Sequence, residues 1–475
     1  MKRAVVIGSG LGGLQVALNL QRAGYAVSVL ERDKHPGGCL QAFHRGTTYF
    51  DTGFHYIGGL ADGQPLNELF RYYGLMDLPW KQLDKDCFDE VILGDHHFRF
   101  AQGFEAFQQQ MTEYFPNEAD GIQKVVDLYR YVGEHTLDHR TEMNSLFSQS
   151  AWEWLSSTIH DPILQQVLSG TCFKMQLDRE TLPLYLFAQI NSTFIQSAWR
   201  LDGSGDLIVK RLTDQITANG GEVRVQARVS HIDVRDGKVC SVVVNDEEHI
   251  DCELVVSDIH PASTIALLSE GVVKNVYRHR LERLRNSYGV FTTYVRLKEN
   301  SLPYLNRNLH IHARGSDAWE SCRVQDGRPR VEHAMVHYYP DQAALDILTP
   351  VSSEVFAPYA DTPHKHRGEE CDALVEDIVN QSIELVAPHI PGLKESIADY
   401  FTSTPLTYAH YLEAPAGTAY GVMKDWRSPL TTVLSPRSPI EGLYYTGQNL
   451  NLHGVLGVTM TSRLTTETIL NTTQI

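Results

Sequence analysis

The stretch Ala4-Val-Val-Ile-Gly-Ser-Gly-Leu-Gly-Gly13 decides the fold. Residues 4–7 form a short apolar run of the kind that fills a buried parallel strand, and apolar residues at helical spacing follow Gly13. Between them lies a G-x-G-x-x-G motif: Gly8 permits a tight turn, Gly10 lets the backbone approach a pyrophosphate, and Gly13 permits close packing of helix on strand. Since the helix N-terminus faces the negative charge, the stretch predicts dinucleotide binding.

An acidic residue supports this interpretation. A second apolar run at residues 26–30 ends at Glu31, where a carboxylate can accept hydrogen bonds from ribose hydroxyls and would repel a 2′-phosphate. A glycine-rich turn without a ligand is the alternative, but strand, helix and acid together favour a dinucleotide. The tight turn at Gly37-Gly38 suits a long ligand lying across the strand ends.

Composition places the chain among soluble globular proteins. It has 475 residues, of which 42% are hydrophobic and 21% charged, and its formal net charge is −17. That charge argues against nucleic acid as a partner, because phosphate binding needs a basic face. The seven cysteines are scattered without a CxxC pair, and no apolar run approaches 18 residues. We therefore expect a cytoplasmic protein.

The α/β pattern recurs at three places along the chain. We predict an α/β fold in which residues 1–65, 200–265 and 435–475 form a discontinuous Rossmann-type domain. Residues 66–199 and 266–434 would form an inserted α+β substrate domain. Within the insert, residues 369–386 read as a helix and residues 351–359 as a strand.

Several motifs resemble a flavoprotein family. The Gly37-Gly38 doublet and the late Tyr445-Thr-Gly447 turn are similar to those of amine oxidases, phytoene desaturases and carotenoid isomerases. Segments 50–58, 405–421 and 445–449 resemble the retinol saturase branch, although many relatives carry an acidic residue where this chain has Gln448. The resemblance covers most of the chain, and it weakens at about residues 85–200 and 300–400.

The resemblance implies non-covalently bound FAD, with Glu31 on the adenosine ribose, Val229 at the adenine and Gly447 near the ribityl chain. The predicted cofactor-binding residues are Gly8, Gly10, Leu11, Gly12, Gly13, Glu31, Arg32, Gly37, Gly38, Val229, Gly447, Gln448, Gly454 and Val455. A second G-x-G-x-x-G motif is absent from the sequence, so the electron donor stays open, with NAD(P)H as one candidate.

The expected activity is saturation, desaturation or isomerisation at a carbon–carbon bond of a hydrophobic polyene or isoprenoid. A flavin amine oxidase and a non-catalytic prenyl- or lipid-binding escort protein are the alternatives. Five large rings can line a substrate tunnel or fill an ordinary helical core: Trp152, Trp154, Phe187, Phe194 and Trp199.

Histidines supply candidates for the proton transfer that accompanies hydride transfer. His55, His410 and His453 lie in the family-like segments, although each can equally be a structural histidine. The pairs His364/His366 and His333/His337 have the residue type of metal ligands but no accompanying ligand set, so no metal is expected.

A basic run raises the question of membranes. Apolar residues are interleaved with Lys274, Arg278, Arg280, Arg283 and Arg285, as in a helix that lies on the inner face of a membrane. An ordinary solvated helix face is the alternative. The oligomeric state stays open.

Overall fold

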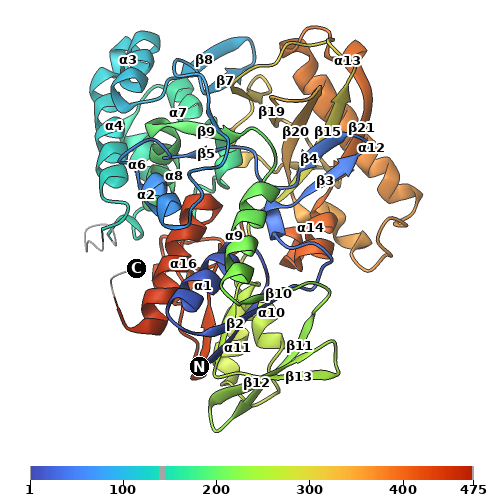
Figure 1. Cartoon of the computed structure of the whole chain (residues 1–475). Coiled ribbons are helices and arrows are strands. Elements are labelled where there is room, and N and C mark those ends of the chain that lie inside the picture. The colour runs from blue at the N-terminus through green and yellow to red at the C-terminus, as the bar shows by residue number, and fades with distance from the viewer. Residues whose placement is uncertain (1, 139–144, 473–475) are drawn as a thin grey trace.

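The computed structural model describes residues 2–138 and 145–472 (Figure 1). A parallel sheet of five strands lies near the N-terminus, in the order β10–β2–β1–β14–β22. These strands are β1 (Arg3–Ile7), β2 (Ala26–Leu30), β10 (Glu222–Arg224), β14 (Leu254–Ser257) and β22 (Leu443–Tyr445). Segments more than 400 residues apart in sequence thus meet in one sheet.

Both faces of this sheet are covered. On one face pack the helices α1 (Leu11–Arg22), α9 (Asp206–Ala218) and α16 (Gly454–Leu470). On the other lies an antiparallel sheet of β11 (Val229–Arg235), β12 (Lys238–Val244) and β13 (Glu248–Asp251). A parallel sheet buried on both faces confirms the predicted Rossmann-type fold. The five parallel strands all fall inside the ranges predicted for this domain, whose numerical bounds stay a prediction.

A second sheet of seven strands crosses the upper part of Figure 1, from β7 and β8 near the middle to β15, β20 and β21 on the right, in the order β21–β15–β20–β19–β16–β7–β8. The β16–β7 pair is parallel and the other neighbours are antiparallel. The strands are β7 (Asp89–Leu93), β8 (His96–Phe100), β15 (Gly289–Leu297), β16 (Asn308–His312), β19 (His333–Tyr338), β20 (Ala344–Val351) and β21 (Ile397–Ser403).

Apolar and polar side chains alternate along β16, so that they lie on opposite faces of the seven-stranded sheet. On β16, Leu309 and Ile311 belong to an apolar cluster shared with the end of α12 (Glu369–Val386), so they face outward. Residues His310 and His312 face the other way, because successive side chains of a strand point to opposite faces. The inner face of this sheet therefore carries buried polar groups.

A helical layer covers that inner face. It consists of α3 (Phe104–Tyr114), α4 (Ala119–Glu134), α6 (Ala151–Thr158), α7 (Pro162–Ser169) and α8 (Leu184–Gln196), joined in the largest apolar cluster. Local capping fixes the helix starts: the Asp161 side chain accepts hydrogen bonds from two backbone N–H groups at the start of α7.

Shorter elements connect these layers. The strands are β3 (Ala42–Arg45), β4 (Thr48–Asp51), β5 (Ile57–Gly58), β6 (Trp80–Gln82), β9 (Ala198–Leu201), β17 (Val324–Gln325) and β18 (Arg328–Pro329). The helices are α2 (Pro65–Tyr72), α10 (Pro261–Ala266), α11 (Asn275–Glu282), α13 (Leu393–Ser396), α14 (Pro405–Leu412) and α15 (Pro429–Thr432).

One predicted strand was wrong. Residues 353–359 form the 3-10 helix η5 (Ser353–Tyr359), because the Ser352 side chain caps the Glu354 N–H and Pro358 cannot donate to a ladder. The helix predicted for residues 369–386 is confirmed as α12.

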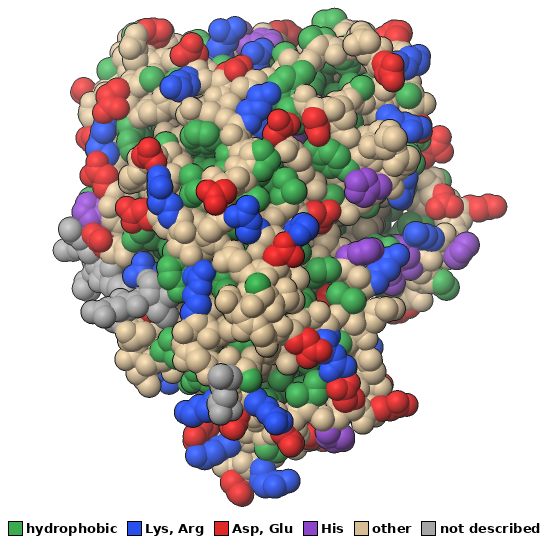
Figure 2. Space-filling view, viewed as in Figure 1, with side chains coloured by type: hydrophobic (Ala, Val, Ile, Leu, Met, Phe, Trp, Pro, Cys, Tyr) green, Lys and Arg blue, Asp and Glu red, His purple; other side chains and the backbone are tan. Residues whose placement is uncertain are grey.

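Acidic and basic side chains are interspersed on the face shown in Figure 2. Within residues 2–138 and 145–472, every helix is too short or too polar to cross a membrane.

Candidate functional site

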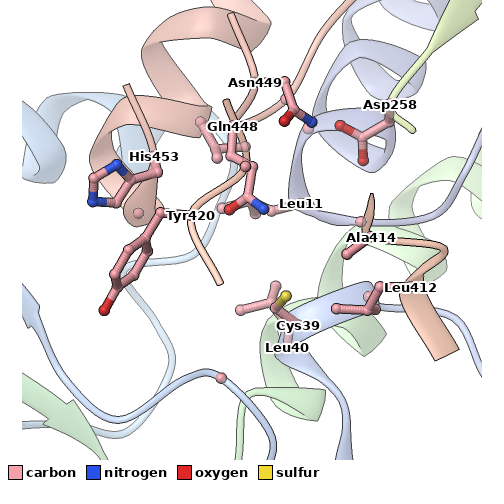
Figure 3. A pocket seen from close by; sticks show the side chains of 18 of the residues that line it. Leu11, Cys39, Leu40, Asp258, Leu412, Ala414, Tyr420, Gln448, Asn449 and His453 are labelled. Atoms are coloured by element: carbon pink, nitrogen blue, oxygen red, sulfur yellow. The ribbon is translucent and has the colours of Figure 1, made fainter. Parts of the chain in front are cut away.

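A cavity of about 620 Å³ extends from the parallel sheet to the seven-stranded sheet and the helical layer. The turns that follow β1, β2 and β14 line one end, as expected at the carboxyl ends of parallel strands. Figure 3 shows Leu11, Asp258, Gln448 and His453 around one part of it. This size lies within the usual range for small-molecule sites.

The glycine turn at the start of α1 forms the floor of that end. Gly10 is the N-cap, and because it has no side chain it leaves the helix N-terminus open to the cavity. A β-carbon at Gly12 would overlap the Asp258 carboxylate and lie 3.0 Å from the Cα of Gly447. A β-carbon at Gly38 would lie 3.3 Å from the Cα of Gly10. Such close backbone around a helix N-terminus fits a pyrophosphate.

Glu31 is held in a fixed orientation at the end of β2. One carboxylate oxygen accepts hydrogen bonds from the N–H (3.1 Å) and hydroxyl of Ser9, and the other accepts from the Asp33 N–H (2.8 Å). Glu31 lines the cavity together with Val229. Both predicted residues thus lie at the same end of the cavity.

Arg32 ties a distant segment to this end. Its guanidinium donates to the backbone carbonyls of His410 (2.6 Å) and Tyr411 (2.9 Å) and pairs with Glu413. Tyr411 and Glu413 also line the cavity. Arg32 thus lines the cavity itself, as predicted for a site residue, and also positions this segment.

Asp258, which follows β14, is a site residue that the sequence analysis missed. Burial raises its pKa to about 7, and the negative charge of Glu31 contributes in the same direction. Its position directly after a buried strand could have indicated a site residue, because ligands bind at the carboxyl ends of parallel strands. A carboxyl group that is partly protonated near neutrality suits a place beside phosphates.

The remaining predicted cofactor residues also come together. The residues that line the cavity near the N-terminus of α16 are Gly447, Gln448, Gly454 and Val455. Gly8, Leu11 and Gly37 line it as well, at the end next to α1. Gly13 does not line it, since its role is packing: a β-carbon there would overlap the Gly8 carbonyl.

The other end of the cavity is mostly apolar. It is lined by Ile190 and Phe194 from α8, by Phe173 from the 3-10 turn at residues 172–174, and by Val290, Met335 and Leu348 from the seven-stranded sheet. Of the five rings proposed for a tunnel, only Phe194 is among the lining residues.

The other four rings belong to the protein interior or its margins. Phe187 is fully buried, and Trp152 packs against Trp319 with a centroid distance of 5.2 Å. Trp154 is partly buried against the same apolar cluster. Trp199 lies in β9, where its indole N–H donates to the Ser197 hydroxyl (2.9 Å). Helical aromatic spacing alone did not distinguish core from cavity.

A buried ion pair stands at this apolar end. The Lys174 ammonium, in the 3-10 helix η3 (Cys172–Lys174), lies 2.7 Å from the Asp89 carboxylate. Asp89 also accepts hydrogen bonds from the Tyr56 hydroxyl and the Asn308 amide, each at 3.0 Å. Tyr56 and Lys174 line the cavity.

The two partners shift each other's pKa. Burial lowers the pKa of Lys174, and the charge of Asp89 opposes that shift. Burial alone would raise the pKa of Asp89, but the charges of Lys174 and His310 hold it well below its usual range. Asp89 therefore favours the charged form of Lys174, while burial makes this lysine release its proton more readily than one in water.

His453 and His55 line the cavity, as the sequence analysis expected of catalytic candidates. His453 is the N-cap residue of α16, and its Nε2–H donates to the Lys174 backbone carbonyl (2.8 Å). The Nδ1 of His55 is 3.7 Å from Asp346. Burial lowers the pKa of both imidazoles to about 4, so both are neutral at pH 7.

His410 is placed elsewhere, and its assignment to the site needs correcting. Its exposed ring stacks on His364 with a centroid distance of 4.0 Å and is not among the residues lining the cavity. The reason is helical geometry: Tyr408 and Tyr411, three residues apart in α14, line the cavity, and His410 lies at a different angle around the helix.

The fold and this site define a flavoenzyme. The profile of the flavin containing amine oxidoreductases matches residues 11–470, and the chain belongs to that family. Since the match covers nearly the whole chain, the protein is an FAD-dependent oxidoreductase.

Individual relatives narrow the comparison. The chain is 25% identical to the all-trans-retinol 13,14-reductase of Danio rerio, over 97% of this chain and 84% of the relative. It is 23% identical to the lycopene-forming phytoene desaturase of Pseudescherichia vulneris, over 89% of each chain. Among solved structures, an oxidoreductase from Methanosarcina mazei aligns with a TM-score of 0.68 at 18% identity, covering 99% of this chain and 100% of that one.

Proposed function

We propose that this enzyme reduces a carbon–carbon double bond of a hydrophobic polyene or isoprenoid. The observation that carries the proposal is one cavity with two unlike ends: an open helix N-terminus at one and a buried Lys174–Asp89 pair among apolar side chains at the other. The names of the reductase and desaturase relatives support the same substrate class.

The residues present fit a non-covalently bound FAD. The α1 turn would hold the pyrophosphate, Glu31 and Val229 the adenosine, and the Gly447–Gly454 turn the ring end of the flavin. When bound, the flavin supplies or accepts the hydride. The positive end of α16 would favour negative charge on the flavin ring.

The proton that accompanies the hydride needs a donor at the apolar end. We assign this role to Lys174, which lines the cavity and whose ammonium pairs with Asp89, so that its proton can be replaced through the hydrogen-bonded group of Asp89 and Tyr56. His453 positions the Lys174 backbone through its Nε2–H. His55, neutral at pH 7, would orient substrate or water beside Asp346.

The test is anaerobic. Protein reduced with dithionite is mixed with all-trans-retinol, and separately with a linear carotene, while the flavin absorbance is recorded. Return of the oxidised flavin band, with a product heavier by two hydrogens, supports reduction. Bleaching of the oxidised protein by the saturated compound means desaturation, and isomerised product with an unchanged flavin band means isomerisation. If the protein instead oxidises amines and releases hydrogen peroxide in air, the amine-oxidase alternative is favoured.

A separate measurement identifies the compound that reduces the flavin. We propose NAD(P)H, and the expected result is that NADH or NADPH bleaches the flavin band without oxygen. If only dithionite bleaches it, another reductant serves the enzyme.

We further propose contact with a membrane surface through α11 and α15. These helices expose Val276 (83%) and Leu430 (92%), and Arg280, Arg283 and Arg285 line a pocket together with Thr431 of α15. Exposed apolar tips beside arginines suit an anionic bilayer. Flotation with vesicles containing phosphatidylserine should exceed that with phosphatidylcholine alone, and the double variant Val276→Asp/Leu430→Asp should lose it.

A further inference from the structure

A group of three metal-ligating residues lies beside the cavity, outside the site described above. Cys172, His312 and His333 are almost fully buried, and one ligand atom from each lies within 4.8 Å of the other two. The sequence analysis paired His333 with His337 and expected no metal; the three residues of this group come from η3, β16 and β19 and meet only in the fold. His312 and His333 are direct partners across the antiparallel β16–β19 pair, so strand register fixes their proximity.

The hydrogen bonds orient His312 as a ligand. Its Nε2–H donates to the Gly170 carbonyl (2.8 Å), so Nδ1 carries the lone pair, which accepts a hydrogen bond from the Nδ1–H of His333. Metal-bound histidines typically donate their other ring N–H to a carbonyl in this way. The Nδ1 of His312 faces the Nδ1 of His333 at 2.7 Å, and the Nε2 of His333 has no hydrogen-bond partner among the described residues.

We propose that Cys172, His312 and His333 bind Zn²⁺, with a water molecule as the fourth ligand. Cysteine sulfur and imidazole nitrogen are the ligands of structural zinc, which takes four in a tetrahedron. Bonds of about 2.0–2.1 Å place two nitrogens roughly 3.4 Å apart. The two rings therefore need to separate by less than about 1 Å on binding.

Coordination would deprotonate Cys172, because a metal-bound cysteine is a thiolate. Its thiol proton would pass to solvent when Zn²⁺ binds.

Such a site would fix one wall of the cavity. Cys172 begins the same 3-10 turn that carries Phe173 and Lys174, both of which line the cavity. Zinc would thereby anchor the turn to β16 and β19. The inference is independent of the substrate proposed above.

The test uses the flavin-loaded, tag-free protein. After growth with zinc and exhaustive dialysis, elemental analysis should find about one zinc per chain. Cys172→Ser and His312→Gln should lose at least four fifths of it. The matched control Cys371→Ser, which removes a buried thiol from α12, should keep it. Zinc absent from the wild type, or equal in Cys172→Ser, would overturn the proposal and leave a hydrogen-bonded histidine pair.

A second measurement uses only the wild-type protein, so it tests the site even if the variants fail to fold. Zinc-depleted wild-type protein is titrated with Co²⁺, and the difference spectrum is taken against the same flavoprotein without cobalt. A saturating cysteinate-to-cobalt charge-transfer band supports the site, and its absence with stoichiometric cobalt contradicts it. Added zinc should also raise the Tm of the depleted protein, since ligand binding to the folded state stabilises it.

Discussion

The two ends of the cavity are built from different materials. The end that we propose for the flavin, here called the flavin end, is mainly backbone: glycines lie in close contact around the start of α1, with few side chains between them. The opposite, apolar end is called the substrate end. The substrate end is made of side chains, including the buried Lys174–Asp89 pair. A site built from backbone depends on glycines, because any added side chain would fill the space for the ligand. A site built from buried charged side chains depends on each charge keeping its partner, because both have been removed from water. The two should therefore fail in different ways.

The largest effect is expected from Gly12→Val at the flavin end. The new side chain would overlap the Asp258 carboxylate and press on the backbone of Gly447, so flavin binding should be lost and the protein destabilised by several kcal/mol. Flavin content and Tm of the purified variant measure this. Gly24→Ala is the control, because no atom lies within 4 Å of its β-carbon; it should keep the flavin despite some strain from its positive φ.

The substrate end should instead fail through an unpaired charge. Removing one partner of a buried ion pair typically costs about 3–5 kcal/mol, so Lys174→Met and Asp89→Asn should each destabilise by that amount. The double variant should be more stable than the sum of the single changes predicts. Urea unfolding of all four proteins gives the coupling energy, and strict additivity would show that the pair is not coupled.

A smaller effect should follow pH at the flavin end. Asp258 has a pKa of about 7 in the folded protein against 3.8 as its ordinary value, so the folded state binds more protons between these pH values. Its stabilising contribution is complete below pH 3.8 and is lost as the pH rises through about 7. The free energy of unfolding should thus fall more steeply from pH 5 to 8 in the wild type than in Asp258→Asn. Parallel pH curves would contradict this assignment.

The smallest effect is expected at His410. Its exposed ring lies outside the cavity, so His410→Ala should change stability by less than about 0.5 kcal/mol and leave flavin content unchanged. His453→Ala should release the Lys174 backbone and impair turnover. Equal turnover in these two variants would contradict the assignment of a functional role to His453 and not to His410.

The same contrast explains what the sequence could predict. The flavin end was predictable because its rules are local: Gly8, Gly10 and Gly13 act through spacing within one turn, and Glu31 through the length of one β–α–β unit. The resemblance added Gly447 and Val229. The substrate end was not predictable, because Asp89, Lys174 and Asn308 meet only through the tertiary structure. His410 was misassigned because a residue's segment does not determine which helix face carries it.

The alternation on β16 has a consequence for how this sequence can change. Moving that strand by one residue would exchange Leu309 and Ile311 with His310 and His312, which would put imidazoles into the apolar layer and leucine into the polar one. Single-residue insertions or deletions within β16 or β19 should therefore be eliminated during evolution. The loops outside these strands can vary in length, so we expect related chains to differ there while keeping the parity of the strands.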